Sequence, residues 1–301
     1  MNVNALHLWS AVLAGDAARR LGLLEVLAES DATAEELALR CGLDVRGCRT
    51  LLDALVSFEL VEQVRDQYRA PELLPLVERS LASISARMQG APPTTASDRV
   101  DGAGQSYPKM VGALGRSYGA LPVLAAPFLR SRRLLDVGAG SAAWSIAVAD
   151  LEPNCRVTAL DLESVMPVTR AHVEDAGHTD RFSFCPGDLF ELSLPESTFD
   201  VVLLAQVCHL FGESRLRALF DHLRPAVAVG GRIAILDRLR CNGQQSRAGA
   251  VHDLSLFART DEGQAHAFSS FAGWLQEAGF VDIGRHTLSA EVSIVYATRA
   301  S

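Results

Sequence analysis

The strongest constraint on the fold is a change of rhythm that begins at Arg132. From there, apolar runs with the length of β-strands alternate with segments of helical periodicity; the runs read RRLLDVG, RVTALDL, RFSFCPGD, FDVVLLAQVCH and GGRIAILD. Continuous apolar strands separated by helical crossovers are typical of a parallel sheet covered by helices on both faces. Residues 132–301 are therefore predicted to form an α/β domain with a Rossmann-like, doubly wound sheet.

The last two strand-like runs follow a different pattern. VDIGRHTL and VSIVYATR are separated only by SAE, which is too short for a helical crossover. We therefore expect these runs to form an antiparallel hairpin at the edge of the sheet.

The N-terminal part of the chain has a helical pattern. Apolar residues recur at helical spacing over residues 5–80, Thr33 and Glu36 fit an N-terminal capping box, and Gly42 fits a helix C-cap. A further helix and a short two-stranded unit follow. This order predicts a mainly α-helical winged-helix domain over residues 1–100.

Helical segments over about 107–118 and 120–130 predict a connector that spans residues 101–131. Residues 83–105 are rich in Ser, Pro, Thr and Gly, which is typical of a linker.

Charge narrows the choice of partners. The chain has a net charge of -8, and residues 1–100 hold ten arginines, no lysine and fourteen acidic residues. A domain that reads DNA needs a basic face, so we expect no nucleic-acid partner and favour packing of the winged helix against a second chain.

Targeting and metal signals are weak. No apolar stretch of about 18 residues suggests a membrane span, and no signal-peptide pattern opens the chain. The six cysteines contain no C-x-x-C and no zinc-finger spacing, which favours free thiols in a reducing compartment. We therefore expect a cytoplasmic protein without a metal or a membrane partner.

The segment LLDVGAGSAAW joins the first strand of the predicted sheet to its helix. Gly138 and Gly140 allow the backbone to pass close to a ligand, and the helix that follows offers free N–H groups. Asp161 ends the second strand, where a carboxylate can accept both hydroxyls of a ribose. This pattern alone also fits a dinucleotide site, because Gly138 to Ala143 match G-x-G-x-x-A.

Three further features separate these alternatives. Asp136 stands two residues before Gly138, where it can meet a cationic group, and Asp188 in PGDLF can contact an adenine amino group. The predicted antiparallel hairpin is the third. With them, residues 132–299 resemble the class I S-adenosylmethionine-dependent methyltransferases. Together with the winged helix, the chain is similar to the small-molecule O-methyltransferases, whose N-terminal domains form an intertwined homodimer.

The resemblance implies S-adenosylmethionine as the cofactor and assigns candidate contacts. Asp161 with Leu162 would bind the ribose, Asp188 with Leu189 the adenine, and Gln206 would lie along the cofactor. The family's loop reads acid-x-Gly-x-Gly-x-Gly, and this chain has Ala142 in place of the last glycine. The additional methyl group fits if φ is negative at that position.

A histidine follows the fourth strand in VVLLAQVCHL. In an extended segment, successive side chains point to opposite sides, so Cys208 and His209 are not expected to form a nucleophile pair. His222, His252 and His266 do not stand at i+3 or i+4 from His209, which disfavours a metal site.

Ligands of such sheets bind beyond the carboxyl ends of the strands, where His209 stands, and the resemblance places the family's catalytic histidine at this residue. A phenol has an ordinary pKa near 10 and an imidazole near 6.5, so an imidazole can accept the phenol proton as the oxygen attacks a methyl group. A histidine that only shapes the pocket is the alternative.

A base also needs a group that orients it. Asp237 ends the neighbouring strand in RIAILD and is the first candidate. The resemblance implies a second acid in a later loop, where Asp261 or Glu262 could stand. Met110 resembles a family position near the substrate. His252 and Asp253, at the start of a predicted helix, are further candidates for the substrate site.

The sequence thus predicts an S-adenosylmethionine-dependent enzyme that methylates an oxygen of a small, aromatic, hydroxylated molecule, with His209 as general base. The alternatives are C- or N-methylation, and a repurposed member of the fold that assists cyclisation or decarboxylation. A nicotinamide oxidoreductase and a regulator that uses its winged helix are the alternatives from other classes.

Overall fold

The structure is a computed structural model of the 301-residue chain. It describes all residues except 1–2, 71–87, 90–105, 241–246, 290–291 and 301. The chain divides into two compact units, Met1–Arg79 and Ser80–Ser301. Each unit has its own buried core. Apart from residues 88–89, the linker predicted over 83–105 lies outside the described residues.

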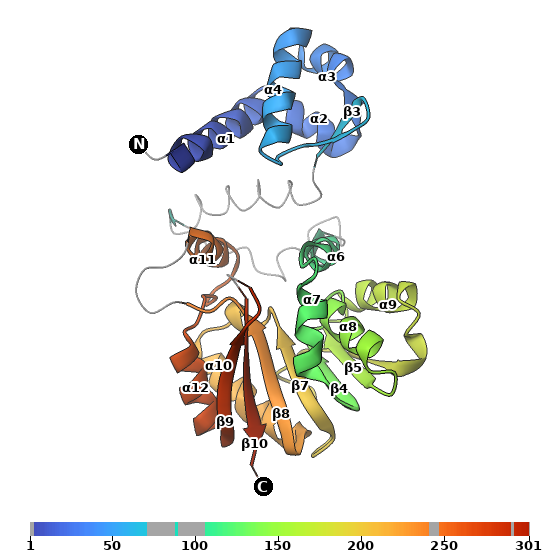
Figure 1. The fold of residues 1–301 in the computed structure, drawn as a ribbon, viewed down its shortest axis with the longest axis vertical. Coiled ribbons are helices and arrows are strands. Elements are labelled where there is room, and N and C mark those ends of the chain that lie inside the picture. The colour runs from blue at the N-terminus through green and yellow to red at the C-terminus, as the bar shows by residue number, and fades with distance from the viewer. Residues whose placement is uncertain (1–2, 71–87, 90–105, 241–246, 290–291, 301) are drawn as a thin grey trace. The chain divides into compact units, whose positions relative to one another are not determined.

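The N-terminal unit combines helices with a small antiparallel sheet (Figure 1). Its helices are α1 (Val3–Arg20), α2 (Leu23–Glu29), α3 (Ala34–Cys41) and α4 (Val45–Ser57). Its strands, in the spatial order β1-β3-β2, are β1 (Ala32–Thr33), β2 (Glu62–Val64) and β3 (Gln67–Arg69). The predicted succession of helix, turn, helix and hairpin is therefore present.

The capping signals in the sequence explain where α3 begins and ends. The Thr33 hydroxyl accepts a hydrogen bond from the Glu36 N–H at 3.2 Å, and the Glu36 carboxylate accepts one from the Thr33 N–H at 2.8 Å. Gly42 ends the helix with φ +67°. The helix thereby places Leu37 in the core of the unit against α4 residues such as Leu52.

A seven-stranded sheet forms the centre of the C-terminal unit, in the order β6-β5-β4-β7-β8-β10-β9. The strands are β4 (Arg133–Val137), β5 (Arg156–Asp161), β6 (Phe182–Pro186), β7 (Phe199–Ala205), β8 (Val227–Asp237), β9 (Phe280–Thr287) and β10 (Ser293–Arg299). Strands β4 to β8 pair in parallel, and β10 pairs antiparallel with β8 and β9. The predicted doubly wound sheet with an antiparallel edge is confirmed.

Helices cover both faces of this sheet (Figure 1). The described helices of the unit are α6 (Ser106–Ser117), α7 (Leu121–Ala125), α8 (Ala143–Leu151), α9 (Met166–Asp175), α10 (Glu213–Leu223), α11 (Arg247–Arg259) and α12 (Phe268–Glu277), with the short 3-10 helices η1 (Ala126–Leu129), η2 (Thr179–Arg181), η3 (Cys208–Leu210) and η4 (Arg224–Ala226). Neighbouring residues of a strand enter opposite cores: Leu134 packs with α7 and α8, and Leu135 packs with α10 and α12.

The parallel register brings the carboxyl ends of the strands to one edge. Val137 pairs with Leu160, and Ala205 pairs with Leu236. The residues that follow β4, β5, β7 and β8 therefore meet although they are far apart in the chain. None of the described helices is long and apolar enough to cross a membrane.

Candidate active site

The loop between β4 and α8 folds back against the end of β5. The Gly138 and Ala139 N–H groups both donate to the Leu160 carbonyl, at 2.8 and 3.0 Å. Gly138 has φ +69°, and a Cβ atom there would lie 2.5 Å from Cγ2 of Val207. Glycine is therefore needed at position 138 for its backbone angle and for this close approach.

Ala142 does not meet the condition under which its additional methyl group was expected to fit. This residue has φ +56° and is fully buried at the N-cap of α8, so the negative φ expected for an alanine is absent. A left-handed backbone costs an L-residue about 1–2 kcal/mol, while a buried methyl group contributes about 0.8 kcal/mol. The two effects largely cancel, so the loop keeps the backbone shape of a glycine with an alanine side chain.

Asp161 holds the middle of the loop. One carboxylate oxygen accepts from the Gly140 N–H and the other from the Leu162 N–H, both at 2.7 Å. Burial raises the pKa of Asp161, and these two hydrogen bonds oppose that rise. Thr169, on α9, donates its hydroxyl to the Gly140 carbonyl at 2.7 Å. Each Asp161 oxygen retains acceptor capacity, as a ribose contact requires.

Asp136 is buried below the loop, where the Ser145 hydroxyl donates to its carboxylate at 2.5 Å. Burial raises the pKa of Asp136 to about 7; the hydrogen bond from Ser145 opposes that rise, and the negative charge of Asp161 adds to it. Sequence reasoning missed Ser145 and Thr169. A hydroxyl in the first turn of the helix after a glycine loop is the signal that would have found Ser145.

The other candidate cofactor residues lie along the same edge. Asp188 is exposed two residues beyond β6 and accepts from the Phe190 N–H at 2.8 Å, and Leu189 packs against the core. Leu162 follows β5 and is 38% exposed. Gln206 leaves β7 with φ +59°, and its amide donates to the Leu236 carbonyl at 3.4 Å.

His209 does not lie in an extended segment, as the sequence interpretation assumed. It belongs to η3, which follows β7 after a break at Gln206 and Val207. Cys208 is fully buried in the core, and burial raises the pKa of its thiol well above the ordinary value. The thiol therefore stays protonated, so a Cys208–His209 nucleophile pair is disfavoured by burial rather than by alternation.

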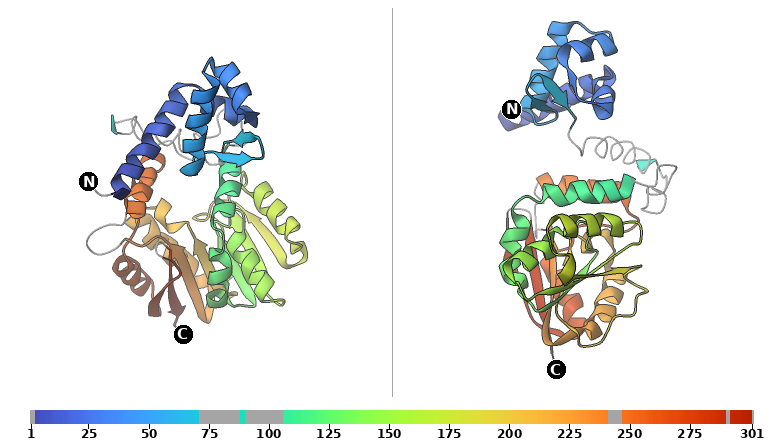
Figure 2. Two further views of the ribbon diagram at one scale, coloured as in Figure 1. Left: turned by 45° about the horizontal axis from the view of Figure 1, so that its top comes forward. Right: turned by 90° about the vertical axis from the view of Figure 1, so that its right-hand side faces the viewer.

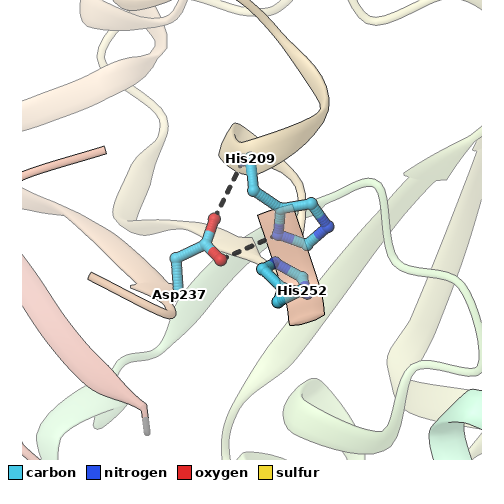
Figure 3. A group of neighbouring side chains, drawn as sticks. All are labelled: His209, Asp237 and His252. Carbon is cyan, nitrogen blue, oxygen red and sulfur yellow. Dashed lines mark hydrogen bonds and ion pairs between the residues drawn. The ribbon is translucent and has the colours of Figure 1, made fainter. Parts of the chain in front are cut away.

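His209 and Asp237 form a buried pair (Figure 3). The Asp237 carboxylate accepts from His209 Nδ1 at 2.7 Å and from the His209 backbone N–H at 3.0 Å, and the Arg238 N–H adds a third bond at 2.8 Å. Burial raises the pKa of Asp237, but the charge and hydrogen bonds of His209 and the Arg238 bond hold this pKa below its ordinary value. An ionised Asp237 requires a proton on Nδ1, which leaves Nε2 as an acceptor.

His209 and His252 are distant in the sequence but lie close together in the structure. His252, inside α11 rather than at its start, lies with its ring centroid 4.9 Å from that of His209 at an interplanar angle of 81° (Figure 3). One side-chain nitrogen or oxygen atom from each of His209, His252 and Asp237 lies within 4.8 Å of the other two, which is close enough for the three residues to be considered as metal ligands. Because the carboxylate already accepts three hydrogen bonds, the geometry fits a hydrogen-bonded pair better than a metal centre.

The remaining candidate residues of the active site lie in α6, in α11 and in the segment that follows α11. The Asp253 carboxylate accepts from the Ala265 N–H at 2.8 Å, which ties α11 to the segment before α12. Glu262 accepts from the Gly212 N–H at 3.1 Å, so it supports the chain after η3 and not the imidazole, and Asp261 is exposed. Met110 lies in α6, and its side chain is outside the described part of the chain.

The comparison with protein families identifies the family of the chain. A model described as an O-methyltransferase domain matches residues 120–281, and one described as an O-methyltransferase dimerisation domain matches residues 7–73. The chain belongs to the O-methyltransferase family. The expected family, enzyme class and cofactor, S-adenosylmethionine, are confirmed for this methyltransferase.

Two relatives that are named as O-methyltransferases support this family assignment. The methyltransferase is 28% identical over 295 residues to the tetracenomycin polyketide synthesis 8-O-methyl transferase TcmO of Streptomyces glaucescens, covering 87% of this chain and 86% of the relative. It is also 28% identical over 295 residues to the 3-hydroxy-5-methyl-1-naphthoate 3-O-methyltransferase of Streptomyces sahachiroi, covering 89% and 85%. The fold matches that of human N-acetylserotonin methyltransferase in complex with SAM, with a TM-score of 0.73, 21% identity and coverage of 98% and 95%.

The loop geometry predicts how substitutions at Gly138 and Ala142 affect stability. Gly138→Ala should lower the free energy of unfolding by at least about 2 kcal/mol, because left-handed strain adds to overpacking against Val207. Ala142→Gly is the control and should change it by less than about 1 kcal/mol, because strain relief and the lost methyl oppose each other. Chemical denaturation measures both; a Gly138→Ala protein of wild-type stability would contradict the geometry.

The buried pair predicts a pH-dependent loss of stability. Asp237→Asn should lower the free energy of unfolding by about 3 kcal/mol at neutral pH, because hydrogen bonds to a buried charge are lost. The low pKa of Asp237 gives stability that is present above its ordinary value of 3.8 and is lost as the pH falls through the lower folded value. In denaturation curves, the difference from wild type should therefore shrink below pH 3.8.

Glu262→Gln, which alters one exposed carboxylate, should cost less than about 1 kcal/mol. Equal losses for the Asp237 and Glu262 variants would show that the buried pair does not stabilise the segment around His209.

Proposed function

We propose that the enzyme methylates a hydroxyl group of a small aromatic molecule and that His209 is its general base. The observation that carries the proposal is the buried pair of His209 and Asp237 at the carboxyl edge of the sheet. Asp237 orients the imidazole so that Nε2 can accept the hydroxyl proton. When bound, S-adenosylmethionine supplies an electrophilic methyl group on a sulfonium sulfur.

The electrostatics support this role. A phenolic hydroxyl with an ordinary pKa near 10 is mostly protonated at neutral pH, so removal of its proton strengthens the nucleophile. The imidazolium that forms lies 2.7 Å from a carboxylate that the fold keeps ionised. Attraction between the two charges in this buried setting stabilises the proton on the base.

We propose that the cofactor occupies the edge formed by the ends of β4, β5, β6 and β7. Asp136 would face its cationic amino group, and Asp161 with Leu162 its ribose. Asp188 and Leu189 would contact the adenine. The backbone at Gly138 and Gly140 would allow close approach, and Gln206 would lie beside the cofactor. The support is a buried acid below the loop and a second acid with acceptor capacity on both oxygens.

The names of the relatives support an aromatic substrate. One acts in tetracenomycin polyketide synthesis and another on 3-hydroxy-5-methyl-1-naphthoate. We assign His252 to the substrate side of the site because its ring faces His209. Met110 remains a second candidate, and Asp253 would act by holding α11 in place.

We propose that two copies associate through the N-terminal unit. The dimerisation model matches this part of the chain, and α1 exposes Val12 and Leu13 at 60% and 65%. A partner chain would cover such apolar surface. The absence of a nucleic-acid partner and the cytoplasmic location stay predictions from the sequence.

Removal of the imidazole tests the base directly. His209→Ala should reduce methyl transfer to phenols at neutral pH by about 10²–10⁴-fold, the usual contribution of general base catalysis. His222→Gln is a matched control, because His222 contacts the Leu192 carbonyl outside the site. Single-turnover transfer from labelled cofactor to a panel of phenols and hydroxylated aromatic acids measures the rate, and calorimetry checks that the cofactor still binds.

Methyl transfer that persists within a few fold in His209→Ala would exclude the general base and leave substrate positioning as the source of the rate. Analysis of the product decides the acceptor atom: a methyl group on nitrogen or carbon would contradict the proposed hydroxyl substrate.

Cofactor binding should depend on pH through Asp136. Burial raises the pKa of this carboxyl to about 7 in the free protein, and a cationic ligand favours its ionised form. Binding should therefore release a proton below about pH 7, and affinity should fall about tenfold between pH 8 and pH 6. Calorimetry across this range should show weaker binding and a flat pH profile for Asp136→Asn. The same slope in both proteins would contradict the role of Asp136.

A further inference from the structure

Helix α6 packs directly on the glycine loop. A Cβ atom built on Gly115 would overlap the side chain of Ser141, with Cβ of Ser141 at 2.6 Å and its Oγ closer still. Ser141 is itself buried, between the two loop residues Gly140 and Ala142. In Figure 2, at the right, α6 runs in green across the edge of the sheet that carries this loop.

A second contact comes from the same face of α6. Val111 precedes Gly115 by four residues, so both lie on one side of the helix. A Cβ atom on Gly140 would meet Cγ1 of Val111 at 3.1 Å. From the other side, Asp161 and Thr169 bind the Gly140 backbone N–H and carbonyl, each at 2.7 Å. Residues 140 and 141 are therefore enclosed between α6 and the ends of β5 and α9.

We propose that Gly115 is a positioning residue of the cofactor site. Its missing side chain allows α6 to press on Ser141 and to hold the loop backbone in the shape that receives the cofactor. The inference rests on the proposed placement of the cofactor at this loop. It adds to that site a helix that precedes the sheet in the chain and lies outside the glycine motif.

The helix itself offers a contrast. Glycine inside a helix is less favourable than alanine, so alanine should be preferred where space allows. At Gly112, one turn before Gly115, a Cβ atom would meet Cε1 of His172 and Cγ1 of Val168 at 3.6 Å and Nη1 of Arg116 at 3.9 Å, which are ordinary van der Waals distances. Alanine therefore fits at position 112 and does not fit at position 115.

The test compares Gly115→Ala with Gly112→Ala and with the double variant Gly115→Ala/Ser141→Gly, which removes the clashing side chain. Calorimetric binding of S-adenosylhomocysteine and thermal unfolding are measured on the full-length protein. We expect Gly115→Ala to weaken binding about tenfold, because the cofactor must then hold the overpacked loop in its binding shape and about 1.4 kcal/mol of such strain corresponds to tenfold in affinity. Gly112→Ala should bind as wild type does, and the double variant should recover most of the affinity.

A kinetic readout separates positioning from general damage. For Gly115→Ala, KM for S-adenosylmethionine should rise by about the same factor while kcat changes little, because loss of uniform binding acts on KM. If Gly115→Ala does not fold, recovery of folding and binding in the double variant supports the proposal.

Wild-type affinity in Gly115→Ala, or a double variant that stays as weak or as unfolded as Gly115→Ala, would overturn the inference. A wild-type protein that binds no S-adenosylhomocysteine would instead overturn the cofactor placement. The two failures are therefore distinguishable.

Discussion

The hydrogen bonds between Asp237 and His209 join the end of one strand to the turn after its neighbour. One carboxylate oxygen accepts from the imidazole and the other from the backbone N–H of the same residue. Both contacts depend on the parallel register of β7 and β8, in which Ala205 lies beside Leu236. A shift of one residue would turn Asp237 to the opposite face of the sheet. The chemistry of the site therefore depends on the pairing of two buried strands.

Further contacts fix the chain that carries the base. The Gln264 N–H donates to the His209 carbonyl at 2.9 Å, and His266 Nε2 lies 2.8 Å from the Phe211 carbonyl. Burial lowers the pKa of His266, so this ring is neutral at physiological pH and can donate that bond. The base thus belongs to a turn held from both sides, which limits the ways in which the imidazole can rotate.

Sequence patterns were sufficient for the elements whose signals are local. The apolar runs predicted the strands, the three-residue gap predicted the hairpin, and Thr33 with Glu36 predicted the start of α3. Strand ends pointed to Asp161, Asp188 and Asp237 as candidates, because parallel strands bring their carboxyl ends to one edge, and the glycine motif pointed to Asp136.

Predictions failed where the relevant contact joins distant segments or a turn replaces a strand. His252 reaches His209 only because α11 crosses the site, which no residue spacing reveals. The chain leaves β7 at Gln206, so alternation was the wrong basis for the direction of His209. The sequence also did not reveal that Ala142 adopts a positive φ, against the intrinsic preference of alanine. Gly115 carries no sequence signal, since its role depends on the position of Ser141.

The most direct test of the account is the protonation of the His209 ring, read by nitrogen NMR of the histidine-labelled enzyme above the pH at which its histidines titrate. We predict a proton on Nδ1, shared with Asp237, and a bare Nε2 that can accept a proton from the substrate. We also expect Asp237→Asn to perturb this state. A neutral His209 with its proton on Nε2 in the wild-type enzyme would contradict its role as general base.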